Sequence, residues 1–168
     1  MRETAADLSA STLSIKLVQR YLNDNLLGRF RLSTTSDDRG AFADGLQTGG
    51  DVIAAWTVLE SPSITGTASM MFTTLVDNSV LVGDTISATA IYELTFNVNL
   101  VGVTGLRLDA LADPSPPAAG PGIGNAGGNF VLTEVLVSAT APVPVPAAAP
   151  PLAGGLALPG LIGARRRG

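Results

Sequence analysis

Any chemistry in this chain would have to rest on oxygen ligands and carboxylates, because its 168 residues include no histidine and no cysteine. That composition excludes thiolate nucleophiles, disulfides, Cys/His metal sites and histidine acid–base catalysis. The residues able to offer oxygen atoms to Ca²⁺ are Asp77, Asn78, Asp84, Asp109 and Asp113. They lack the D-x-D-x-D spacing, so we expect ordinary turn residues, no cofactor and no metal site beyond, at most, a weak structural Ca²⁺.

The same carboxylates argue against catalysis. Asp109 and Asp113 are too close in sequence, at one strand end, to face each other across a sugar as the acid pair of a glycosidase does. We therefore expect no catalytic residues and no enzyme activity.

Aromatic and basic residues offer two candidate binding features. Trp56, the single tryptophan, could stack on a pyranose ring, but a lone Trp in a module is more often a core residue, and we expect it in the core. Arg29 and Arg31 could hold an anion. Alternating charges on a strand more often form a solvated face, which is the interpretation we favour.

A glycine-rich loop is a third candidate, because successive glycines can present backbone N–H groups to an anion. The residues of this candidate ligand loop are Gly120, Pro121, Gly122, Asn125 and Asn129. The run lacks G-K-[ST] and does not open a helix, which argues against a phosphate loop. We expect a turn-rich structural loop.

The elements that position these residues are predicted to be strands. Period-2 alternation and turn signals at 77–78 and 83–84 predict strands at 12–18, 28–34, 54–59, 67–75, 79–82, 86–99, 105–111 and 129–138. Their short, even spacing predicts an all-β antiparallel sandwich. The last strand, rich in β-branched residues, is expected deep in a sheet. The long Pro/Gly loop before it is either functional or held by its own packing.

Composition narrows the class of protein. The charged fraction is 14%, below the usual ~25%, and Gly (19) and Pro (11) are abundant, which suits an extracellular β protein. The net charge is −4, and between residues 40 and 164 Arg107 is the sole base against nine acids. A body this acidic should not bind nucleic acid.

The domain organisation expected from these patterns has four parts. Residues 1–38 carry two strands, which either pair with the following domain or remain from a truncated upstream module; we favour the remnant. Residues 39–53 form a linker, 54–140 the sandwich and 141–168 a tail. No signal peptide opens the chain, so we expect a truncated N-terminus.

Three stretches resemble a galactose-binding-like, discoidin-type module of bacterial surface proteins: 27–39 (LGRFRLSTTSDDR), 56–84 and 102–137. The pattern GxTGxRLExLxDxxLPxxGPGRAxxGNFVLxE is kept at Gly102, Gly105, Arg107, Leu108, Gly120, Pro121, Gly122, Gly128, Asn129, Phe130, Val131, Leu132 and Glu134. It departs at Asp109, Pro116 and Ile123, the last replacing an Arg. The resemblance covers most of residues 11–140 and implies a jelly-roll sandwich, with residues 1–38 closing a preceding copy.

The C-terminal tail has a spacer (141–151), an uncharged apolar segment (152–164) and an Arg cluster, Arg165, Arg166 and Arg167. As a short hydrophobic helix, the uncharged run from 147 to 164 would extend ~27 Å, just under a ~30 Å hydrocarbon core. The arginines would act as a positive-inside membrane stop. The alternative is a disordered Pro/Ala tail with a basic end.

This tail resembles the PEP-CTERM sorting signal, in particular its VPLPA variant, through the motif Val143, Pro144, Val145, Pro146 and Ala147. The resemblance implies an exosortase-type membrane protease as partner, transient residence in the inner membrane, and a Gram-negative bacterium that exports exopolysaccharide. The function expected is an exported, non-catalytic cell-surface or matrix protein whose sandwich binds carbohydrate or another matrix polymer, or acts as a spacer. The alternative is an accessory module of a larger secreted hydrolase.

Overall fold

The computed structural model describes residues 5–21, 24–42, 53–60, 62–67, 70–84, 87–116, 119–124 and 127–142. Apart from the short 3-10 helix η1 (Arg39–Ala41), every element is a strand: β1 (Ala6–Gln19), β2 (Asn25–Leu27), β3 (Arg29–Thr35), β4 (Thr57–Val58), β5 (Ser63–Gly66), β6 (Met70–Thr74), β7 (Val80–Asp84), β8 (Ala90–Val103), β9 (Gly105–Ala110), β10 (Gly122–Gly124) and β11 (Glu134–Thr140). The predicted all-β class is confirmed. The helix expected at 152–164 lies outside the described residues.

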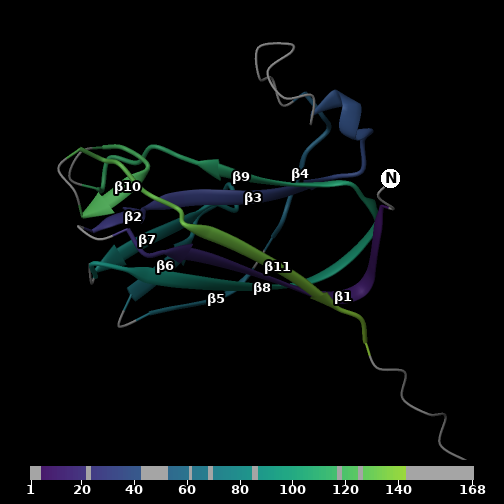
Figure 1. The fold of residues 1–168 in the computed structure, drawn as a ribbon, viewed down its shortest axis with the longest axis horizontal. Helices are drawn as coiled ribbons and strands as arrows, with labels where there is room; N and C mark the ends of the chain where they lie inside the picture. Colours follow the sequence, from purple (N-terminus) through teal and green to yellow (C-terminus); the bar gives the residue numbers. More distant parts are fainter. Residues whose placement is uncertain are drawn as a thin grey trace, which may run out of the picture.

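The strands form two layers with antiparallel pairing (Figure 1). One layer is a four-stranded sheet in the order β11-β1-β8-β5. The other is five-stranded: β9 pairs with β3 along residues 30–35, while β7 and β4 pair with the two ends of β3. A strand has two sides, so β7 and β4 must share the side of β3 that β9 leaves free. A small third sheet pairs β10 with β2.

The core lies between the layers and follows from the alternation of each strand. Leu13, Ile15 and Leu17 of β1 point inward and are at most 3% exposed. They pair across the sheet with Phe96, Leu94 and Tyr92 of β8, which share the same face. From the opposite layer, Phe30 and Leu32 of β3 pack against them in one hydrophobic cluster. The predicted strands at 12–18 and 28–34 are therefore confirmed.

An aromatic group ties the layers together at the centre. The ring of Tyr92 stacks 6.0 Å from that of Phe30 and meets the edge of Phe72 at 5.2 Å. Its hydroxyl donates a 3.0 Å hydrogen bond to the backbone carbonyl of Leu27. A buried phenol needs such a partner, because an unsatisfied polar group in the core is costly.

The boundary expected at residue 38 runs through this single core. β1 lies between β8 and β11, and β3 lies between β9 and the pair β7 and β4, so the first strands occupy the middle of both sheets. The pairing alternative is the one observed, and residues 5–35 are not a structural unit separate from residues 54–140. Two strands alone could not bury a core, whereas the joined sheets can.

Two further expectations need correction. β11 is an edge strand whose sole partner among the described strands is β1, and each of its seven residues is exposed. Residues 83 and 84 are not a turn but the end of β7, which pairs with β6. The alternation does not predict the short strands β5, β2 and β10. The expected turn at 77–78 is confirmed: Asn78 has a φ of 59° and donates to the Leu75 carbonyl at 2.9 Å.

The long loop between β9 and β11 is packed against the end of the sandwich. The Pro121 carbonyl accepts the backbone N–H of Gly28 at 2.6 Å, and the N–H of Val131 donates to the carbonyl of Asn25 at 2.9 Å. Ile123 is buried in the core cluster. These contacts hold part of the loop against the sheets.

Candidate functional site

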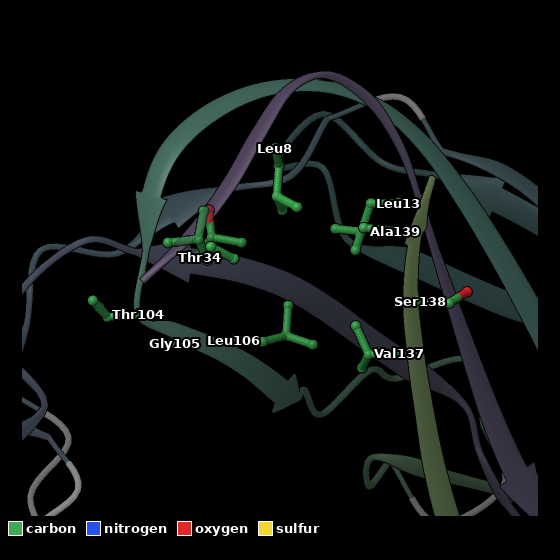
Figure 2. A pocket seen from close by; sticks show the side chains of 11 residues that line it. Leu8, Leu13, Thr34, Thr104, Gly105, Leu106, Val137, Ser138 and Ala139 are labelled. Carbon is green, nitrogen blue, oxygen red and sulfur yellow. The ribbon is translucent and has the colours of Figure 1, made fainter. Parts of the chain in front are cut away.

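The described part of the chain has an apolar groove of about 320 Å³ on the open side of the sandwich, where β9 and β11 end their sheets (Figure 2). We call it the lateral groove. Its walls are formed mainly by Leu8, Leu13, Val103, Leu106, Val137 and Ala139. Figure 2 shows Leu8, Leu106 and Val137 pointing into the same space. No charged side chain lines it among the described residues, so it could take an apolar group but could not orient a charged one.

The groove exists because the inner face of β11 extends past the opposite sheet. Val135, Val137 and Ala139 pair with Leu17, Ile15 and Leu13 and so share the inward face. Val135 and Val137 nevertheless remain 43% and 53% exposed. The side chain of Ala139 is small and leaves space in the groove between the two sheets.

Charged residues gather on the outer face of the five-stranded sheet. This outer ion-pair network consists of Arg29, Arg31, Asp77, Arg107, Asp109 and Asp113. Arg29 is central: its guanidinium lies 2.9 Å from a carboxylate oxygen of Asp77 and 3.3 Å from one of Asp113. It also donates to the Ser79 hydroxyl at 3.0 Å.

The second half of the network follows the pairing of β3 with β9. Arg31 lies directly opposite Asp109 in the register, and their side chains meet at 3.4 Å. Arg107 donates to the same carboxylate at 3.1 Å. The Nε atoms of Arg31 and Arg107 are buried without a hydrogen bond; Arg107 Nε lies 3.0 Å from Asp109 but outside hydrogen-bonding geometry.

The expected solvated face is therefore wrong for Arg29 and Arg31. Their side chains are 21% and 27% exposed and are paired with carboxylates. Three arginines face three aspartates, so the network carries no net charge and does not attract an anion. Partly buried pairs of this kind tie the sheet to its loops.

Trp56 lies beside this network and not in the core, which corrects the expectation. It does not belong to the core cluster and is only partly buried. The Arg107 guanidinium sits 4.8 Å from the centre of its ring, a cation–π contact. Phe42 meets it edge-on at 5.3 Å.

Two aspartates of the network are held ionised by their own turns. Hydrogen bonds from Ser79, and to a lesser extent the charge of Arg29, lower the pKa of Asp77. Hydrogen bonds from Ser115, and to a lesser extent the charge of Arg29, likewise lower the pKa of Asp113. Neither carboxyl group is suited to donate a proton near neutral pH.

The structure does not bring the suggested Ca²⁺ ligands together. Asp77, Asp109 and Asp113 are each engaged with arginine, and the described part of the chain holds no group of three or more acidic side chains that could bind a metal ion. The suggested ligand loop is mostly used internally. Gly120 accepts from Asp113, Gly122 donates to Gly128, and Pro121 accepts from Gly28. Asn129 is exposed, and Asn125 lies outside the described residues.

Sequence reasoning missed the lateral groove. The signal that could have indicated it is the run Val135, Leu136 and Val137, which places apolar residues on both faces of one strand. A strand buried on one face normally alternates with polar residues.

No protein family, no curated protein and no solved structure matches the chain. The class is therefore defined by the fold and the site alone: an antiparallel β protein with an apolar lateral groove and a neutral ion-pair network. In the part of the chain that the structure describes, no helix has the length and hydrophobicity to cross a membrane. The sorting motif 143–147, the apolar segment and the Arg cluster 165–167 lie outside the described residues.

Proposed function

We propose that this protein is an exported, non-catalytic surface or extracellular-matrix protein of a Gram-negative bacterium. The observation that carries the proposal is the order of features at the C-terminus. The last strand of the body ends at Thr140, and the motif Val143–Pro144–Val145–Pro146–Ala147 comes next, then an uncharged apolar segment and Arg165–Arg167. That order supports recognition by an exosortase-type membrane protease during transient residence in the inner membrane.

The sorting proposal is tested with a reporter fused to residues 141–168. In a host that carries the protease, we expect the fusion to be cleaved and released from the inner membrane. In the same host without the protease, it should stay uncleaved. In a matched variant, Gln replaces Arg165, Arg166 and Arg167. This variant should no longer be oriented in the membrane and should not be cleaved. A fusion that remains soluble and intact with the protease present contradicts the proposal.

The β body is proposed to be a galactose-binding-like module that binds a carbohydrate or another matrix polymer. The position of Trp56 supports this. It lies outside the core and is only partly buried, and the Arg107 guanidinium next to its ring donates to Asp109, so an indole ring adjoins polar groups. An aromatic ring beside hydrogen-bonding groups suits the apolar face and the hydroxyls of a sugar. The antiparallel two-layer arrangement is compatible with the jelly-roll topology.

The binding proposal is tested on a glycan array with the full chain, because β1 and β3 are integral to both sheets. We expect binding that the Trp56→Ala variant loses and the Met71→Ala variant keeps, since Met71 is exposed on another strand. Absence of binding by the folded parent chain contradicts a lectin-like role and leaves the spacer role. An upstream reading frame with a catalytic domain would favour the alternative, an accessory module of a secreted hydrolase.

A further inference from the structure

The edge of β11 that no described strand pairs with is the feature that the proposed function does not use. All seven residues from Glu134 to Thr140 are exposed. Val135 and Val137 are on the inner face and Leu136 on the outer face, at 43%, 53% and 46% exposure. Along the open side of an edge strand, alternate residues have backbone N–H and C=O groups without a hydrogen-bond partner from a neighbouring strand.

The other edge strands are all shorter than β11, and one of them carries charges. β9, the neighbouring edge across the lateral groove, carries Arg107 and Asp109. β5 has four residues and ends in Gly66, β4 has two residues, and β6 has five. Short strands and charged side chains are usual defences against edge pairing. β11 has no Pro, Lys, Arg or Gly, and its one charge, Glu134, is at its first position.

We propose that β11 pairs with β11 of a second copy of this chain, antiparallel and centred on Val137, so that two four-stranded sheets join into one. This is the two-fold register that pairs all seven residues. It places Glu134 against the partner's Thr140, Val135 against Ala139 and Leu136 against Ser138. Val137 meets its own symmetry mate.

Self-pairing is favoured over a foreign strand because the edge is complementary to itself. In the two-fold register no like charges oppose each other, since Glu134 faces Thr140. Inner-face residues meet inner-face residues, and the outer-face Leu136 meets Ser138, so each apolar side chain gains a cross-strand neighbour. Seven residues from each partner make a small interface beside the ~800 Å² per partner of a standard one, so the dimer should be reversible and concentration-dependent.

A cysteine at the two-fold centre reports on the pairing directly, because the chain has no cysteine of its own. In the full-length chain, Val137→Cys should form a disulfide-linked dimer under mild oxidation, since directly opposed residues have Cα atoms ~4.5–5.5 Å apart, within disulfide range. The matched control is Met71→Cys, on an exposed position of the edge strand β6. Equal cross-linking at both positions, or none at 137, overturns the proposal.

A charge at the same position tests it without covalent chemistry. By sedimentation over a wide concentration range, the full chain should dimerise. Val137→Lys, which opposes two ammonium groups, should raise the dissociation constant by about tenfold or more. Met71→Lys should leave it unchanged, and both variants should show the parent's circular dichroism. A chain that is monomeric at every concentration contradicts pairing through β11. A Val137→Lys variant that dimerises as tightly as the parent also contradicts it, and would mean that the chains associate through another surface.

Discussion

Asp77 accepts hydrogen bonds from the hydroxyl and the backbone N–H of Ser79 at 2.6 and 3.1 Å, and its other oxygen meets Arg29 at 2.9 Å. These contacts favour the ionised form and lower the pKa of Asp77 below the usual 3.8. The resulting stabilisation is present above pH 3.8 and is lost as the pH falls through the lower, folded-state pKa.

Asp77→Asn should therefore be less stable than the parent at neutral pH, and the difference should shrink toward zero in strong acid. The measurement is urea unfolding at about pH 7 and about pH 2. Glu60→Gln, at an exposed position, controls for the loss of one charge. A difference that stays constant with pH would contradict the role assigned to Ser79 and Arg29.

Tyr92 provides a second prediction, at alkaline pH. Tyr92→Phe removes the buried hydrogen bond from the phenol to the Leu27 carbonyl, so we expect a loss of about 1 kcal/mol in the free energy of unfolding. Burial raises the pKa of Tyr92 above its usual 10.0, so the parent should lose stability as the pH rises past 10, when the unfolded phenol ionises. The Phe variant should lack that loss.

Urea unfolding at neutral and alkaline pH measures both effects of Tyr92→Phe. Tyr21→Phe is the matched control, because Tyr21 is 57% exposed. If both variants follow the parent at high pH, the alkaline loss does not arise from Tyr92.

At the scale of elements, the loop before β11 is fixed by close backbone contacts at Gly122. A Cβ there would collide with the backbone of Asn129 and approach the Gly128 carbonyl at 2.8 Å. Gly122→Ala should therefore lower the free energy of unfolding by about 2 kcal/mol or more, since backbone cannot yield as a side chain can. Gly83→Ala in β7, where an added Cβ would have no neighbour within 4 Å, should change it by less than about 0.5 kcal/mol. Comparable losses of stability in the two variants would mean that the loop backbone moves to accommodate the added Cβ at residue 122.

The sequence predicts where strands occur better than where they lie in the sheets. Alternation identifies β1 and β3 because each buries one face, which is a local property. It places β11 too deep because β-branched residues indicate a strand but not its neighbours, and the exposure of β11 depends on the opposite sheet ending at β9.

The candidate site is predicted less well for the same reason. Residue type alone assigns Trp56 to the core, but its place is set by Arg107 and Phe42, which are distant in sequence. The charges of Arg29 and Arg31 are evident from the sequence, whereas their carboxylate partners depend on the pairing of strands far apart in the chain.

For the whole molecule, the consequence is that the fold depends on its first thirty-five residues. β1 supplies Leu13, Ile15 and Leu17 to the core and separates β8 from β11. β3 supplies Phe30 and pairs with β9, β7 and β4. Without these strands, β11 and β9 lose the partners that hold them in the sheets, and Tyr92 loses the ring it stacks on.

A chain consisting of residues 39–168 should therefore fail to fold cooperatively, although it retains the entire segment that the sequence predicts as the sandwich. We expect no near-ultraviolet circular dichroism and no urea transition, while the full chain shows both. Adding a peptide of residues 1–38 should restore the transition by supplying β1 and β3 in trans. A fragment 39–168 that folds stably and cooperatively would contradict the single core. It would show that residues 54–140 fold without β1 and β3, as a self-sufficient module.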